Sequence, residues 1–401
     1  MAQVRSFWSP ARCFAVTYAA YTAIYVARVN LSMVSPALKD AGVLTAAQIG
    51  LLGGVFSVTY AAGRLLNGIL NDRLAPWTMI AAGLGAVGFG NVLSGLFPPF
   101  ALMVALWGIN AYGQSMLWGS VLHVVSALYD PAKARLRSAA AATAVATGNL
   151  VGIVANAWLV SRFGPRFAYI VPGLLNLVMA PLVFAALGRL PASAPAHRRT
   201  VADSFRIVAF RRMRAMLFPA LCHGIVKDNV SLWMAVYFVD AFRVDLMKSS
   251  YFLLLVPAVG LAGRLSYEFF YRRCGSNESA VASRAFAVSA VMAALLLLPG
   301  VPPWAAAIGL GLIYAAVSVA SSSLLAVFPL RFARLGESAS ASGFLDFATY
   351  FGAGVGSIVY GVVVRRFGLA GYGVMFASWA VLSVASSAIL AAIARRQRAA
   401  S

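Results

Sequence analysis

Two short stretches that share one pattern indicate how this chain is organised. They read Arg28-Val29-Asn30-Leu31-Ser32 and Lys227-Asp228-Asn229-Val230-Ser231. Both lie inside otherwise apolar segments, and their equivalent positions are 199 residues apart. A cation inside a lipid bilayer costs roughly 2.5 to 3.5 kcal/mol on insertion scales. Two cations at matching places therefore predict a duplicated membrane protein in which each copy keeps a functional charge.

The composition is that of a membrane protein. Of the 401 residues, 61% are hydrophobic and 11% are charged, and the mean hydropathy is +0.83. A soluble protein of this size would have about a quarter of its residues charged. The first apolar run lacks a small-residue cleavage site, so we expect it to be retained as a helix. Three cysteines without paired spacing predict neither a disulfide framework nor a metal site.

The hydrophobic pattern predicts an all-α membrane protein with twelve transmembrane helices in two pseudo-symmetric bundles of six. We expect an N-terminal bundle at residues 1–188, a polar cytoplasmic linker at 189–213 and a C-terminal bundle at 214–401. The expected helices cover residues 13–36, 46–71, 77–97, 99–128, 137–161, 166–188, 214–241, 247–270, 279–300, 303–330, 338–363 and 370–394.

The distribution of positive charge predicts the orientation, because Lys and Arg gather on the cytoplasmic side of a membrane. If both termini are cytoplasmic, 21 of the 32 Lys and Arg residues fall on that side and seven on the other. We therefore expect a multi-pass protein of a bacterial inner membrane. The formal charge of +21 indicates topology, since no basic soluble module for nucleic acid is present. Four cations remain within the expected helices: Arg28, Arg64, Lys227 and Arg264.

A second repeat supports the duplication. Ala62-Gly63-Arg64-Leu65 recurs 200 residues later as Ala262-Gly263-Arg264-Leu265. Parallel repeats joined by a cytoplasmic linker are the arrangement of the major facilitator superfamily. The segment Gly68-x-x-x-Asp72-Arg73 resembles that superfamily's signature between helices 2 and 3. This resemblance implies that Gly68, Asp72 and Arg73 form a cytoplasmic gating motif.

The first expected helix carries a polar stripe. Tyr21, Tyr25, Arg28 and Ser32 are spaced by four, three and four residues, which places them on one helical face. One interpretation is an aromatic packing stripe with Arg28 extended toward the headgroups. The other is a cavity lining in which tyrosine hydroxyls flank a guanidinium. The position of Arg28, about midway along the expected helix, favours the cavity.

The seventh expected helix carries a similar stripe. His223, Lys227 and Ser231 share one face, and Asp228 lies about 100° around the helix. Lys227 can bind an anion, or it can form a structural ion pair with Asp228 or with Asp346. His223 is either a packing histidine or a proton carrier.

Two further i, i+4 pairs lie in expected helices. Tyr60 and Arg64 form one pair, and Asn110 and Gln114 form the other. Intramembrane amides serve either to join helices or to contact a substrate. Arg64 precedes Asp72 by eight residues, about 12 Å of helix rise, which predicts a relay or gate residue in the cytoplasmic third.

Two cations on pseudo-symmetric helices suit a divalent anion. A phosphate monoester carries a charge of about −1.5 to −2 at neutral pH, which two cations can offset. Arginine adds bidentate hydrogen bonds, whereas lysine acts as a point charge. We therefore expect a phosphate-like substrate, although a dicarboxylate or sulfate also fits this charge.

Taken together, these motifs resemble those of the organophosphate:phosphate antiporters. The resemblance rests on Tyr21-x-x-x-Tyr25-x-x-Arg28-x-Asn30, on Tyr60-x-x-x-Arg64 and on Asn110-x-x-x-Gln114-x-x-x-Trp118. It implies that Arg28 binds substrate phosphate, that Tyr21, Tyr25 and Tyr60 line the cavity, and that Arg64 and Lys227 are family cations. The family's Trp-Pro-Pro is replaced by Trp118-Gly119-Ser120, and its helix 5 histidine is absent near Thr143–Asn149. The organic part of the substrate can therefore differ.

The resemblance implies a carrier and not an enzyme, without cofactor or metal. We expect a monomer that moves a small phosphorylated or phosphonate-like anion by alternating access, in exchange for inorganic phosphate. A first alternative is a proton-coupled symporter of a carboxylate or siderophore-like anion, with Asp228 or Asp346 as the proton site. A second alternative is a transporter-like sensor of sugar phosphate.

Overall fold

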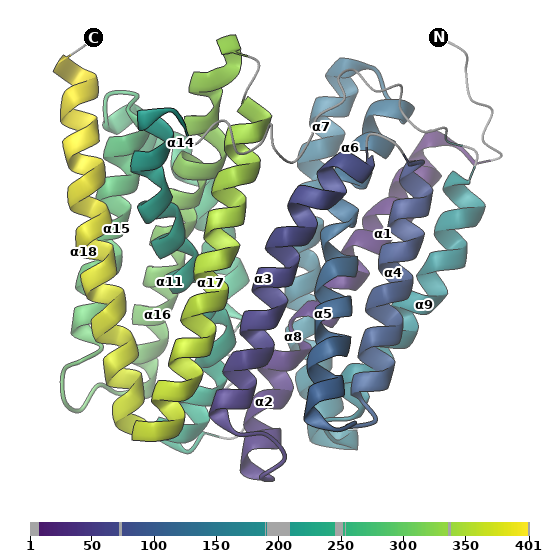
Figure 1. Cartoon of the computed structure of the whole chain (residues 1–401), viewed down its shortest axis with the longest axis horizontal. Helices are drawn as coiled ribbons and strands as arrows, with labels where there is room; N and C mark the ends of the chain where they lie inside the picture. The colour runs from purple at the N-terminus through teal and green to yellow at the C-terminus, as the bar shows by residue number, and fades with distance from the viewer. Residues whose placement is uncertain are drawn as a thin grey trace. The chain divides into compact units, whose positions relative to one another are not determined.

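The computed structural model describes residues 8–71, 74–188, 190, 209–244, 252, 254–335 and 338–399, and most of these are helical (Figure 1). The helices of the N-terminal half are α1 (Pro10–Arg28), α2 (Asn30–Asp40), α3 (Ala46–Asn71), α4 (Pro76–Ser94), α5 (Phe100–Ser115), α6 (Leu117–Leu128), α7 (Pro131–Ala142), α8 (Ala144–Phe163) and α9 (Phe167–Leu187). Those of the C-terminal half are α11 (Arg211–Phe242), α13 (Leu255–Leu265), α14 (Tyr267–Arg273), α15 (Glu278–Leu295), α16 (Pro303–Ser321), the π-helical η2 (Ser322–Val327), the 3₁₀ segment η3 (Phe328–Leu335), α17 (Ser338–Phe367) and α18 (Leu369–Ala399).

The all-α, twelve-helix prediction is confirmed. Within the described part of the chain, each expected span coincides with one helix or with consecutive helices. Eight helical stretches in the described ranges are individually long and apolar enough to cross a membrane. The structure adds breaks that hydropathy does not reveal. The expected helix at 13–36 is divided at Val29, immediately after Arg28, although Val29 is itself apolar.

The chain forms two compact units. Unit 1 comprises residues 1–37 and 59–201, and unit 2 comprises residues 38–58 and 202–401. Both α2 and α3 therefore pass from one unit to the other, and residues 38–58 pack with the C-terminal helices. Most of the expected linker at 189–213 lies outside the described residues, so its role as the division between two bundles stays a prediction.

In unit 1, α4 packs on α5 and α9, and α1 packs on α8 and α9. Glycines make these contacts close. A β-carbon added to Gly113 of α5 would lie 2.8 Å from the carbonyl oxygen of Gly83 in α4. A β-carbon at Gly173 of α9 would lie 3.0 Å from the carbonyl oxygen of Gly88. Small residues let helix backbones approach where lipid supplies no hydrophobic driving force between helices.

In unit 2, α11 packs on α17, α15 packs on α18, and α13 packs on α16. Serine hydroxyls join α15 to α18, where the Oγ atoms of Ser289 and Ser383 lie 3.1 Å apart. The first half of α3 joins this unit through α17, since the Ser357 hydroxyl donates to the carbonyl oxygen of Gly50 at 2.9 Å. A β-carbon at Gly361 would lie 2.8 Å from the Cα atom of Gly50.

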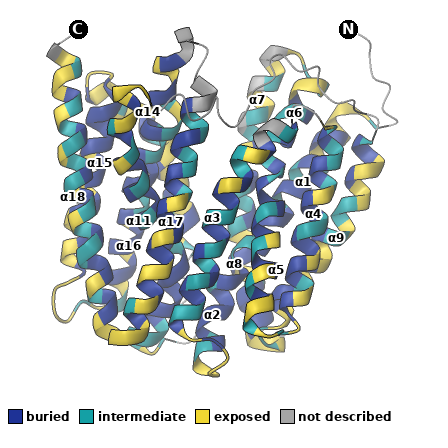
Figure 2. Ribbon diagram, viewed as in Figure 1, coloured by how far each residue is buried: buried dark blue, intermediate teal, exposed yellow. Residues whose placement is uncertain are grey.

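The outer surface of unit 2 is suited to lipid. Exposed residues recur along α17 and α18 (Figure 2), and several are large and apolar, such as Val362 at 53% and Val381 at 68% exposure. Such a surface fits a multi-pass membrane protein, because these side chains would be unfavourable in water.

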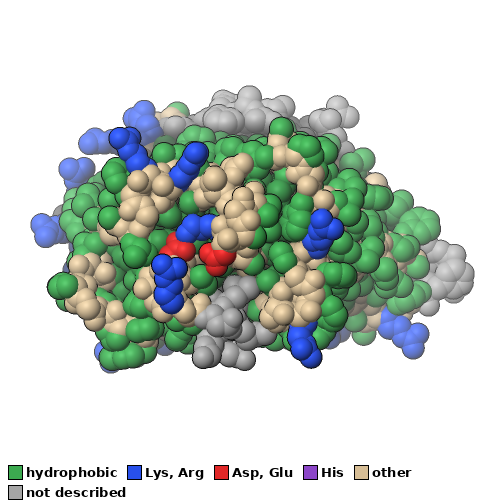
Figure 3. All heavy atoms as spheres, turned by 90° about the horizontal axis from the view of Figure 1, so that it is seen from below, with side chains coloured by type: hydrophobic (Ala, Val, Ile, Leu, Met, Phe, Trp, Pro, Cys, Tyr) green, Lys and Arg blue, Asp and Glu red, His purple; other side chains and the backbone are tan. Residues whose placement is uncertain are grey.

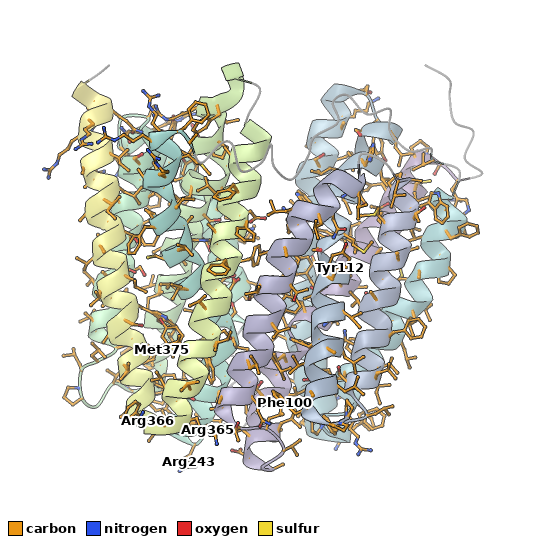
Figure 4. All side chains as sticks on the ribbon, in the orientation of Figure 1. Phe100, Tyr112, Arg243, Arg365, Arg366 and Met375 are labelled. Carbon is orange, nitrogen blue, oxygen red and sulfur yellow. The ribbon has the colours of Figure 1, made fainter. Side chains whose placement is uncertain are left out.

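The charges of unit 2 gather at the ends of its helices. Arg243, Arg365 and Arg366 lie at the end opposite the C-terminus (Figure 4). At that end Lys39 pairs with Asp240, whose carboxylate also accepts a hydrogen bond from the Tyr372 hydroxyl at 2.7 Å. An end-on view shows a few acidic and basic side chains next to one another, with hydrophobic side chains around them (Figure 3).

Candidate functional site

Arg28 of unit 1 lies over two tyrosine rings. It is the last residue of α1, where the carbonyl end of the helix favours a cation. Its guanidinium carbon lies 4.6 Å from the ring centre of Tyr60 in α3 and 5.6 Å from that of Tyr25. Both tyrosines are buried, whereas Arg28 is half-buried. The rings therefore hold the guanidinium inside unit 1 through cation–π contact, and part of the side chain remains exposed.

The hydroxyl groups of the stripe meet beside this cation. The Tyr21 and Tyr25 oxygens lie 3.3 Å apart, within hydrogen-bond distance. The Tyr21 ring stacks on Trp118 of α6, with ring centres 5.5 Å apart. Arg64 of α3 is close enough to act electrostatically on both tyrosines. The structure thus brings together the tyrosines and both cations that the sequence singles out in the first half.

The two amides of α5 bind each other. The Gln114 side-chain nitrogen donates to the Asn110 Oδ1 atom at 3.1 Å, and exposure is 0% for Asn110 and 1% for Gln114. The Asn110 side chain also packs against α4, because a β-carbon at Gly90 would lie 3.2 Å from its Cβ. The bond between the amides lies within α5, so the choice between helix joining and substrate contact stays a prediction. In this conformation Asn110 Nδ2 and Gln114 Oε1 have no hydrogen-bond partner among the described residues.

Lys227 of unit 2 is paired with its sequence neighbour. The Lys227 Nζ atom lies 2.9 Å from Asp228 Oδ1, and the two side chains are 15% and 23% exposed. Arg264 of α13 and Tyr314 of α16 also act electrostatically on Lys227. His223, one turn away on α11, is buried at 1% exposure. Asp346 lies half-buried on α17. Of the two carboxylates proposed for the ion pair, Asp228 is therefore bonded to Lys227 in unit 2.

The asparagine of the repeated pattern joins helices in each unit. The Asn30 amide donates to Asn91 Oδ1 of α4 at 2.5 Å. The Asn229 amide donates to the carbonyl oxygens of Ile225 at 2.8 Å and of Ala353 in α17 at 3.3 Å. Both asparagines are at most 1% exposed. The repeat therefore combines a buried packing amide with a cation that retains partial exposure.

Part of the expected gating motif lies outside the described residues, and one candidate residue was not expected. Of the gating motif, Gly68 lies in α3, whereas Asp72 and Arg73 lie outside the described residues. Tyr314 was not expected as a site residue, because a single tyrosine in an apolar span gives no signal. Only its position beside Lys227 makes it a candidate.

Two proteins of similar sequence have names that refer to the transport of phosphorylated compounds. The probable hexose phosphate transport protein of Chlamydia trachomatis is 23% identical over 285 residues, which are 63% of this chain and 62% of that protein. This chain therefore spans less than two thirds of that relative. The phosphoglycerate transporter protein of Salmonella typhimurium is 24% identical over 397 residues, covering 87% of this chain and 81% of that protein.

Solved structures support the fold. A mutant of the nucleoside transporter NupG superposes with a TM-score of 0.79 at 15% identity, covering 95% of this chain and 99% of that chain. Residues 17–357 match the sequence profile of the Major Facilitator Superfamily. The relatives are consistent with the organophosphate:phosphate antiporters within it. The chain therefore belongs to the Major Facilitator Superfamily, whose members are transporters and not enzymes.

Proposed function

We propose that the protein is a secondary transporter of a small phosphorylated or phosphonate-like organic anion. The observation that carries this proposal is the placement of Arg28 over Tyr25 and Tyr60. A guanidinium inside a membrane bundle is costly unless an anion uses it. Tyr25 and Tyr60 hold the guanidinium in place, and arginine can bind a phosphate in a bidentate manner.

The second cation comes from unit 2. Lys227 binds the same anionic group in our proposal, because a charge near −2 needs more than one positive partner. Its bond to Asp228 is compatible with this role, since an incoming phosphate competes with the carboxylate for the ammonium group. The names of the hexose phosphate and phosphoglycerate relatives support a phosphorylated substrate.

The transport cycle follows from the charges. The two units rock alternately to open the substrate site to either side of a bacterial inner membrane, and both chain termini are cytoplasmic. A bound anion lowers the net positive charge of the site, so we infer that the loaded carrier reorients faster than the empty one. The positive charge of the site therefore favours exchange of the organic anion for inorganic phosphate, performed by a single chain.

A specific observation favours a second candidate. Asp228 is a partly buried carboxylate bonded to a substrate-binding lysine, an arrangement that can couple a proton to anion uptake. Proteoliposomes distinguish the two candidates. Exchange predicts that internal phosphate accelerates entry of a labelled sugar phosphate. Acceleration by an inward proton gradient, independent of internal phosphate, would support symport through Asp228 or Asp346 instead. Binding without transport would indicate a sensor and contradict both.

A further inference from the structure

The repeated Ala-Gly-Arg-Leu motif occupies equivalent places in both units. In α3, a β-carbon at Gly63 would clash with the side chain of Ser115 in α5. In α13, a β-carbon at Gly263 would lie 2.6 Å from the carbonyl oxygen of Ala315 in α16. Each glycine therefore allows its helix to pack closely on a later helix of the same unit. Arg264 follows Gly263 as Arg64 follows Gly63. Each arginine therefore comes directly after the glycine at which its helix packs.

Arg264 lies on the face of α13 that packs within unit 2. It follows Gly260 by four residues and Pro257 by seven, and both of those residues are buried. At 100° per residue, these positions share one face of the helix. Leu261 and Leu265, on the adjoining face, are 40% and 75% exposed. The lipid-facing side of α13 is therefore the leucine side.

Arg264 is nevertheless exposed. Its charge acts on two inward groups of α11, Lys227 and the buried His223. Gly260 packs on Tyr314, because a β-carbon there would lie 2.5 Å from the Tyr314 Cε1 atom. Arg264 is thus an exposed arginine on the face of α13 that packs on α16, one turn after the glycine that meets the Tyr314 ring.

The charge of Arg264 lacks a partner within the described protein. No ion pair or hydrogen bond joins it to another described residue, whereas Lys227 is bonded to Asp228. An ionisable residue on the packed face of a membrane helix that no described residue pairs is a candidate for contact with a ligand. No described carboxylate pairs with Arg264, and our assignment gives the phosphate to Arg28 and Lys227.

We propose that Arg264, with Tyr314 beside it, binds a second acidic group of the substrate. This inference rests on the proposed function and narrows its substrate class to small organic anions with two acidic groups, such as a phosphate and a carboxylate. Lys227 takes the phosphate, and the Arg264 guanidinium binds the second acid in a bidentate manner.

Two probes that differ in one group test the proposal. Phosphoglycerate carries a carboxylate where glycerol phosphate carries a hydroxymethyl group. Binding of each is measured by calorimetry on the full-length purified chain. We expect the wild type to bind phosphoglycerate at least about tenfold more tightly, and Arg264→Gln to lose about ten- to hundredfold for phosphoglycerate only, as for a charged hydrogen bond. Glycerol phosphate binding should stay within about twofold.

Controls separate this role from a structural one. Arg272→Gln removes an exposed cation that is paired with Glu268 on α14 and should leave both affinities unchanged. Arg264→Lys keeps the charge and should restore part of the preference. Equal losses for both probes, or no loss for either, would overturn the Arg264 site while the proposed function stands. A wild type that binds neither probe would overturn the proposed function, and this inference with it.

Discussion

The two units hold their cations in different ways. In unit 1, the Arg28 guanidinium lies over the ring of Tyr60, which comes from α3. In unit 2, the position 200 residues after Tyr60 is Gly260, and the ring near Lys227 is that of Tyr314 from α16. Lys227 is also bonded to a carboxylate, Asp228. Both units thus keep a cation beside a tyrosine, but they build that pair from different helices.

This difference suggests that Arg28 and Lys227 contribute to anion binding in different ways. The tyrosine rings hold the Arg28 guanidinium in place, so this cation contributes a fixed geometry to anion binding. An ammonium that is bonded to a neighbouring carboxylate can release that partner when an anion arrives, so its contribution is exchangeable charge. Arg28 should therefore be sensitive to shape, and Lys227 should be sensitive to the charge of Asp228.

The largest expected effect comes from Arg28→Lys, which keeps the charge and removes the planar donors. We expect kcat/KM for uptake of a sugar phosphate to fall by about a hundredfold, near the upper end for charged hydrogen bonds. Arg12→Lys, at the exposed start of α1, serves as the control and should be neutral. Unchanged uptake by Arg28→Lys would contradict the proposed contact between Arg28 and the substrate phosphate.

A smaller effect is expected from Asp228→Asn, which leaves Lys227 without its carboxylate. Because both side chains are partly exposed, we expect the ligand-free protein to lose about 1 to 2 kcal/mol of stability, less than for a fully buried pair. Saturating phosphate should then raise the Tm of the variant more than that of the wild type. Complete loss of transport, together with loss of proton dependence, would instead identify Asp228 as a coupling residue.

The smallest effects should come from the asparagines of the repeat. Asn30→Leu and Asn229→Leu each remove hydrogen bonds that join helices. Interhelical hydrogen bonds in membranes average about 0.6 kcal/mol. Thermal unfolding should therefore show similar, modest losses in both units, with substrate affinity nearly unchanged. A large loss of affinity in one variant alone would show that the two asparagines have different roles.

The helices could be predicted from the sequence because lipid imposes a simple rule on spanning segments. About 20 apolar residues are required for each crossing, and the polar breaks between runs are short. The stripe Tyr21, Tyr25 and Arg28 was equally visible, because helical spacing alone places these residues on one face. The break at Val29 was not visible, since it interrupts the helix without interrupting the apolar run.

The rest depended on contacts between distant parts of the chain. Gly260 and Tyr314 are 54 residues apart, and nothing in either local sequence indicates that one accommodates the other. The Asn110–Gln114 bond is local, but helical spacing does not tell whether these amides bond to each other or to another helix. Residues 38–58 pack with unit 2 because their glycines fit those of α17, a match that the repeat pattern does not contain.

The central claim is that one cation from each unit binds the same anionic group. A double-mutant cycle on Arg28→Lys and Lys227→Gln, with glycerol phosphate affinity measured by calorimetry, tests it most directly. We expect the two losses to be non-additive, with a coupling of at least about 0.5 kcal/mol, as for residues that share one partner. Losses that add within experimental error would contradict the claim.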